Sequence, residues 1–236
     1  MSGETFRELL FADETLIAPG VFDGLTASIV EEIGFDAAYL GGWTTGASTA
    51  ITEPIISPDK MCERAREVVE STELPLLVDG DAGFGNAPHT YRAVNQYAKA
   101  GIAGIHIEDQ VYPKRLHYHT GRRHEGREHI IPADEMEHKI RAAVESRDDH
   151  DEDIVIIGRS DAARGQRREE HGETIEDAIE RVNRYIDVGA EAAMVFPQTR
   201  AELERSVDEI DAPVILTLLE EREPNLTVAY FFYFWV

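Results

Sequence analysis

Short apolar runs alternate with longer amphipathic segments along the chain, and this pattern constrains the fold more than any other feature. The apolar runs with the length and composition of strands cover residues 15–22, 37–42, 74–81, 104–110, 154–162, 192–198 and 212–220. The segments with helical periodicity cover residues 24–34, 57–72, 87–101, 132–147, 174–189 and 200–211. Repeated strand–helix units build parallel sheets. Because the strands are almost continuously apolar, the pattern favours an α/β fold of the (β/α)8 TIM-barrel type over an open doubly wound sheet.

We predict one barrel domain over residues 1–236, because no linker, repeat or low-complexity stretch interrupts the pattern. Gly34, Gly101 and Gly189 close helical segments, where we expect left-handed caps. The C-terminal part of the barrel is expected to be truncated or altered, since residues 228–236 read VAYFFYFWV without a charge. An exposed aromatic end would promote aggregation, so this stretch either completes an eighth strand or is not the natural terminus.

The charge balance restricts the partners of the chain. Forty-six acidic against 23 basic residues give a formal net charge of −23. Such a surface repels nucleic acid and anionic membranes, so we expect neither as a partner. An acidic, lysine-poor surface is typical of halophilic proteins, in which salt screens the self-repulsion. Cys62 is the single cysteine of the sequence, so an internal disulfide is excluded. The lack of a signal peptide or a long apolar span predicts a cytoplasmic protein.

Polar residues close most of the predicted strands, and in a parallel barrel these ends meet at one mouth, where active sites form. The residues are Tyr39, Gly41, Gly42, Trp43, Asp79, Asp81, Glu108, Asp109, Arg159, Asp161 and Gln198. Carboxylates from adjacent strands would repel one another unless a cation joined them. Ligands that are all oxygen favour Mg2+, with Mn2+ possible, over zinc. The alternative for DGDAGFGN taken alone is a tight acidic turn.

The motifs VDGDAGFGN (residues 78–86), GIHIEDQVYPKR (104–115) and IIGRSDA (156–162), with residues 19–43 upstream, resemble the isocitrate lyase and phosphoenolpyruvate mutase superfamily. The resemblance runs from about residue 18 to residue 217. It implies a Mg2+-binding barrel that cleaves or forms bonds next to a 2-oxo acid. It also implies a homo-oligomer, usually a tetramer with a swapped C-terminal helix, with a dimer as the alternative. Members with EDQ and KR are mostly lyases of 2-hydroxy di- or tricarboxylates.

The resemblance also implies roles for individual residues. Asp79, Asp81 and Glu108 would hold Mg2+ partly through waters, and Glu53 stands where relatives carry a further acidic residue. Arg159 would clamp a substrate carboxylate; its alternative is a structural pair with Asp161.

The substrate pocket is expected to include the turn after the second strand. Gly41, Gly42 and Trp43 resemble a turn whose backbone N–H groups meet the substrate carboxylate, although Gly41 replaces the usual Ser. Tyr39 and Gln198 would line the same pocket, with a core position as the alternative for Tyr39.

The sequence departs from the family at the proposed proton donor. Related lyases read KRCGH, in which the Cys protonates the carbanion, whereas this chain reads Lys114, Arg115, Leu116, His117, Tyr118. Leucine cannot transfer a proton, so we hypothesise that His117 or Tyr118 replaces the thiol. Lys114 and Arg115 keep the family pattern as catalytic candidates. A catalytic lid fits this segment better than a zinc site or a nucleic-acid patch.

The expected function is Mg2+-dependent carbon–carbon cleavage of a 2-hydroxy polycarboxylate. Isocitrate, giving glyoxylate and succinate in a glyoxylate-cycle role, is the first expectation. The alternatives are a 2-methylisocitrate lyase, an oxaloacetate decarboxylase or hydrolase, and a phosphonate-bond enzyme. A catalytically inert or truncated paralogue is a further alternative, favoured by Leu116, Gly41 and the aromatic C-terminal stretch.

Overall fold

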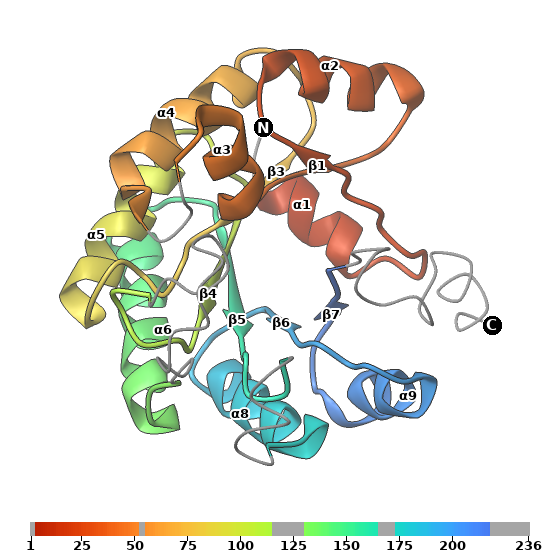
Figure 1. Ribbon diagram of the computed structural model, residues 1–236, viewed down its shortest axis with the longest axis vertical. Helices are drawn as coiled ribbons and strands as arrows, with labels where there is room; N and C mark the ends of the chain where they lie inside the picture. The colour runs from red at the N-terminus through yellow and green to blue at the C-terminus, as the bar shows by residue number, and fades with distance from the viewer. Residues whose placement is uncertain (1–2, 52–54, 115–129, 165–172, 218–236) are drawn as a thin grey trace.

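A curled sheet of parallel strands forms the centre of the molecule (Figure 1). The computed structural model describes residues 3–51, 55–114, 130–164 and 173–217. In these ranges the strands are β1 Gly20–Val21, β2 Ala38–Leu40, β3 Leu76–Asp79, β4 Gly104–Glu108, β5 Val155–Arg159, β6 Ala192–Met194 and β7 Val214–Ile215. The seven strands are paired in chain order from β1 to β7, each parallel to the next. The predicted TIM-type α/β architecture is therefore confirmed, although the strands are shorter than the apolar runs.

Helices lie around the outside of the sheet (Figure 1). They are α2 Gly24–Ile33, α4 Pro58–Val69, α5 Ala87–Ala98, α6 Ala133–Asp149, α8 Ile175–Asp187 and α9 Arg200–Glu209. Each falls within or close to a segment predicted from helical periodicity. Gly34, Gly101 and Gly189 have φ values of 97°, 84° and 112°, which confirms the predicted left-handed conformations. Because residues with a side chain rarely adopt such angles, glycine is the residue that ends these helices with the least strain.

Two further helices in the described ranges were not predicted. The first, α1 Gly3–Leu10, lies at the N-terminal ends of the strands, where its Phe6 ring contacts Gly104 of β4 and its Gly3 N–H donates to Asp153 O at 2.9 Å. The second, α3 Gly42–Thr49, begins directly after β2 at the opposite end. α1 therefore closes the bottom of the barrel, and α3 begins at its mouth.

Side chains alternate between two apolar layers because successive residues of a strand point to opposite faces. One row, which includes Val78, Ile105, Ile107 and Ile156, packs between the sheet and its helices. The other row faces the barrel interior with Phe6 and includes Leu77, Val155, Ile157 and Met194. Toward the C-terminal ends of the strands, the inward-facing row continues with Asp79, His106, Glu108 and Arg159. The polar strand ends thus point into the barrel mouth.

None of the helices in the described ranges is long and apolar enough to cross a membrane.

Candidate active site

The predicted carboxylates come together at the ends of β3 and β4. Asp79 closes β3, Asp81 follows two residues later, and Glu108 closes β4; their residues are 5%, 7% and 0% exposed. The backbone joins them: Asp81 N donates to Asp79 Oδ1 at 2.8 Å, and Glu108 N donates to Asp81 O at 3.0 Å. Adjacent strands therefore place all three acids in one buried group, as the sequence predicted.

The DGDAGFGN loop needs glycine for this close packing. A Cβ at Gly80 would lie 2.6 Å from His106 O, a distance that real side chains do not tolerate. Gly83 and Gly85 have φ values of 73° and 148°, and Asp81 itself has a φ of 51°. The acidic-turn interpretation and the metal-site interpretation are thus compatible, because the turn conformation is what brings Asp81 next to Glu108.

Among the residues that the structure describes, two cations contact the acidic group. Lys114 Nζ lies 2.8 Å from Glu108 Oε1 and 3.5 Å from Asp81 Oδ2, and Arg159 Nη1 lies 3.0 Å from Glu108 Oε2. Burial, helped by the charges of Asp161 and Asp81, raises the pKa of Glu108 to about 8 against the opposing effect of both cations. Burial also opposes ionisation of Asp79, but His106, Lys114 and Arg159 together hold the pKa of Asp79 below its usual range. Positive charge added beside these acids would therefore favour the ionised form of Glu108.

The chemistry of these residues fits a hard divalent cation. A small cavity of about 10 Å³, close to the volume of one water-sized sphere, is lined by Asp79, Asp81 and Gly42 together with apolar side chains. Among the described residues, the two Glu108 oxygens are ion-paired with Lys114 and Arg159, but neither accepts a hydrogen bond of regular geometry. Within those residues no three His, Cys, Asp or Glu side chains already converge in metal-binding geometry. Although Asp79, Asp81 and Glu108 do not converge in that geometry, their carboxylate oxygens are the donors that Mg2+ prefers, and these three residues would hold the ion with waters completing its shell.

Arg159 forms an ion pair with Asp161, the alternative that the sequence left open to a clamp on a substrate carboxylate. Its Nε and Nη2 contact the two carboxylate oxygens of Asp161 at 2.8 and 3.1 Å, and its guanidinium carbon lies 4.9 Å from the Phe196 ring centroid. Asp161 also accepts hydrogen bonds from Gln110 and Arg164. Burial opposes the charge of Asp161, but the two arginines outweigh it and lower its pKa. The same guanidinium therefore joins Asp161 to Glu108.

Asp109, the middle residue of EDQ, has a supporting position that sequence reasoning did not assign. It is fully buried and accepts hydrogen bonds from Ser160 Oγ at 2.8 Å, Asp161 N at 2.9 Å and Tyr185 OH at 2.9 Å. Arg181 lies 3.3 Å away as a counterion. Asp109 thus fixes the chain that follows β5, and with it the Arg159–Asp161 pair.

His106 is a second residue that sequence reasoning missed. It is 0% exposed, its Nε2 lies 3.0 Å from the hydroxyl of Tyr39, and its Nδ1 lies 3.9 Å from Asp79 Oδ1. The signal was present in the sequence, since His106 precedes Glu108 by two residues in a strand and must share its face. The predicted pocket residue Tyr39 is therefore linked to the acidic group.

The remaining predicted pocket residues are placed differently. The N–H of Gly42 donates to Asp79 Oδ2 at 3.1 Å, so in this structure it serves a carboxylate of the protein. Trp43 is 55% exposed, and Gln198 is an exposed residue whose backbone N–H donates to Glu202. Four predicted site residues, Glu53, Arg115, His117 and Tyr118, lie outside the described residues.

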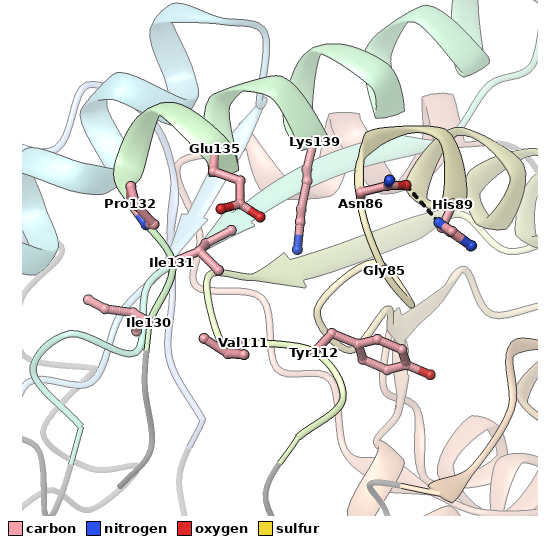
Figure 2. A pocket seen from close by; sticks show the side chains of 10 residues that line it. All are labelled: Gly85, Asn86, His89, Val111, Tyr112, Ile130, Ile131, Pro132, Glu135 and Lys139. Atoms are coloured by element: carbon pink, nitrogen blue, oxygen red, sulfur yellow. Dashed lines mark hydrogen bonds between the residues drawn. The ribbon is translucent and has the colours of Figure 1, made fainter.

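A larger hollow of about 440 Å³ lies beside the mouth, between the N-terminal ends of α5 and α6 (Figure 2). In the figure, Lys139 and Glu135 point into it from α6, and Asn86 bonds His89 at the start of α5. The buried Lys139 Nζ donates to Ala82 O at 3.0 Å, and burial lowers the pKa of Lys139. Lys139 therefore anchors the backbone of the loop that carries Asp81.

The chain is similar to known proteins over most of its length. Residues 6–231 match the family model described as phosphoenolpyruvate phosphomutase. The 2,3-dimethylmalate lyase of Eubacterium barkeri is 35% identical over 218 residues, which are 91% of this chain and 70% of that protein. The isocitrate lyase of Haloferax volcanii is 32% identical over 95% of this chain, which spans 60% of that protein's length.

A solved structure extends the similarity to three dimensions. The complex of phosphonopyruvate hydrolase with oxalate and Mg2+ has a TM-score of 0.78 and 28% sequence identity, covering 97% of this chain and 76% of that one. The match reaches nearly the whole chain, so it includes the strand ends that carry the acidic group.

Proposed function

The chain belongs to the phosphoenolpyruvate phosphomutase family, within the superfamily that includes isocitrate lyases, and we propose that it is a Mg2+-dependent lyase that cleaves a carbon–carbon bond of a 2-hydroxy polycarboxylate. The lyase names of its relatives support the predicted enzyme class. The observation that carries the proposal is the buried group of Asp79, Asp81 and Glu108 at the barrel mouth, in contact with Lys114 and Arg159.

Each part of this group has a use in such a reaction. Asp79, Asp81 and Glu108 would hold Mg2+, which would supply stabilisation of the negative charge that develops on the substrate. Arg159 has a fixed, planar set of donors suited to a carboxylate, and Asp161 holds it in place. Lys114 supplies a second positive charge beside the acids. These cations suit a substrate with several carboxylates.

Isocitrate is the first candidate substrate, cleaved to glyoxylate and succinate. 2-Methylisocitrate is the second, and the relative named 2,3-dimethylmalate lyase favours it, because 2-methylisocitrate and 2,3-dimethylmalate both carry a methyl group on the carbinol carbon. Cleavage next to a methylated carbinol carbon gives pyruvate in place of glyoxylate. The identity of the 2-oxo product therefore distinguishes the two candidates.

The test is an assay of the full chain with Mg2+ in concentrated KCl, in which phenylhydrazine traps any 2-oxo product. Isocitrate, 2-methylisocitrate, 2,3-dimethylmalate and oxaloacetate are supplied separately. A 2-oxo product from one of the first three supports the lyase. Oxaloacetate is itself trapped by phenylhydrazine, so its turnover is followed by chromatography of the reaction mixture; oxalate and acetate from oxaloacetate alone would move the chain to the hydrolase alternative, and pyruvate from oxaloacetate alone to the decarboxylase alternative. Silence with all four, while Mg2+ still binds, would support the inert paralogue.

We also propose that His117 or Tyr118 donates the proton that the usual cysteine supplies in related lyases. The proposal rests on the sequence, in which Leu116 occupies the cysteine position. Cleavage is measured for His117→Ala and Tyr118→Phe, with His138→Ala on α6 as a control for loss of a histidine. Loss of about 100-fold or more in one of the two variants is expected, and two fully active variants would contradict the proposal.

A further inference from the structure

The hollow between the N-terminal ends of α5 and α6 is lined by groups that the proposed reaction does not use (Figure 2). Its volume of about 440 Å³ falls in the range of small-molecule sites in proteins. The apolar residues that line it are Val111, Ile130, Ile131 and Pro132, and Lys139 points into it from α6. The hollow therefore has room for a small ligand that combines an apolar part with a charged group.

Lys139 is a buried cation that lacks a counterion among the described residues. It is 2% exposed, and its one hydrogen bond to those residues runs from Nζ to Ala82 O at 3.0 Å. An ammonium has three N–H groups, so two of them are not used within that part of the chain. Because a buried charge is costly unless it is paired, this ammonium favours an anion in the hollow.

Glu135 restricts which anions fit. It lies one turn before Lys139, is exposed, and also points into the hollow (Figure 2). As the third residue of α6 it stands where a glutamate usually accepts the N–H of the N-cap residue, but the N-cap is Pro132, which has no N–H. Its carboxylate is therefore left facing the hollow, where it repels a ligand that carries a second negative charge.

We propose that this hollow is a second ligand site, specific for small monocarboxylates with a short apolar chain, in which the carboxylate pairs with Lys139 and the chain packs against Val111 and Ile131. The site is separate from the acidic group at the mouth, whose cations are Lys114 and Arg159, and it needs no Mg2+. The inference goes beyond the proposed function, so either can fail without the other.

The test is an NMR titration of the full chain with acetate, butyrate and succinate, each in the presence of EDTA so that no acid binds through a metal ion. Butyrate should bind more tightly than acetate by about fourfold for each added methylene that the apolar residues bury. It should also bind more tightly than succinate, whose second carboxylate meets Glu135. A protein that does not bind butyrate, or that binds the three acids equally, would overturn the inference.

Two buried lysines show where the acid binds. Lys139→Met removes the cation of the hollow, and Lys114→Met removes a cation of the mouth. Lys139→Met should weaken butyrate binding about tenfold or more, the loss of one hydrogen bond between charged groups. Lys114→Met should bind butyrate as the wild type does. A larger loss in Lys114→Met, or equal losses in both variants, would place the acid outside the hollow and overturn the inference.

Glu135→Gln keeps the inference testable if Lys139→Met does not fold, because Glu135 is exposed. This variant should bind succinate more tightly relative to butyrate than the wild type does. Glu145→Gln changes another exposed glutamate of α6, far from the hollow, and should leave the ratio of the two affinities unchanged. The same ratio in Glu135→Gln as in the wild type would show that the bound acid does not face Glu135, and would overturn the inference.

Discussion

Lys114 contacts two of the three acids that would bind Mg2+, so its ammonium opposes the binding of a second cation at the same place. We expect Lys114→Met to bind Mg2+ about tenfold more tightly without substrate, equivalent to about 1.4 kcal/mol. Calorimetry measures this directly, with Lys99→Met on the exposed end of α5 as the control. Equal or weaker Mg2+ binding by Lys114→Met would contradict the assigned contact.

Asp161 should contribute to stability in a pH-dependent way. Its folded-state pKa is lowered, chiefly by Arg159 and Arg164 against the effect of burial, so its contribution is present above the unfolded value of about 3.9 and is lost as the pH falls below it. Asp161→Asn should lower the free energy of unfolding by about 3–5 kcal/mol at pH 7, because it leaves a buried guanidinium underpaired.

Urea unfolding at pH 7 and at about pH 3.5, just below the unfolded pKa of an aspartate, checks this prediction. The difference between the wild type and Asp161→Asn should shrink at the lower pH, since the unfolded wild type then takes up a proton that the folded aspartate does not. A matched control is Asp211→Asn, an exposed residue beyond α9. A difference that is the same at both pH values would rule out the ion pair as the cause.

The acids of the site could be predicted from the sequence more readily than the residues that surround them. Asp79, Asp81 and Glu108 could be predicted because carboxylates at adjacent strand ends are unusual and must be compensated. His106 was missed because a single polar residue in an apolar strand is easily counted with the core. The donation of the Gly42 N–H to Asp79 could not be predicted either, since it depends on α3 beginning immediately after β2.

At the scale of elements, α1 and α3 are the described helices that the sequence concealed. Each has only eight residues, too few for a convincing helical period, and α1 is stabilised by the contacts that it makes with the barrel. The six predicted outer helices were recognisable because each repeats its apolar positions over several turns. The predicted strands were too long, because the residues that precede and follow a barrel strand in the sequence can be apolar without forming the hydrogen bonds of the sheet.

Phe6 on α1 should be important for stability but not for the site. Its ring is 1% exposed and packs against Gly104 at the end of the barrel opposite the mouth. We expect Phe6→Ala to lower the free energy of unfolding by about 3–5 kcal/mol, as large-to-small core changes do, with unchanged Mg2+ binding. Phe11→Ala, at a position that is 58% exposed just beyond the helix, is the control. A loss below about 1 kcal/mol in urea unfolding of Phe6→Ala would show that α1 does not close the barrel.

At the scale of the whole molecule, the net charge of −23 predicts a marked dependence on salt. Repulsion between acidic side chains destabilises the compact state, and salt screens it as the Debye length falls from about 10 Å at 0.1 M to about 3 Å at 1 M. The midpoint of thermal unfolding should therefore rise with KCl over this range. Circular dichroism at increasing KCl measures it, and a midpoint that does not change would contradict the halophilic interpretation of the surface.

The central claim is that the acidic group at the barrel mouth supports Mg2+-dependent carbon–carbon cleavage. Isocitrate and 2-methylisocitrate labelled with 13C at both carbons of the scissile bond report this directly, because the one-bond 13C–13C coupling disappears only when that bond breaks. We predict that the wild type removes the coupling from one of the two substrates in the presence of Mg2+, that EDTA stops the reaction, and that Asp81→Asn abolishes it. Retention of the coupling in both substrates by a folded, Mg2+-loaded protein would contradict the claim.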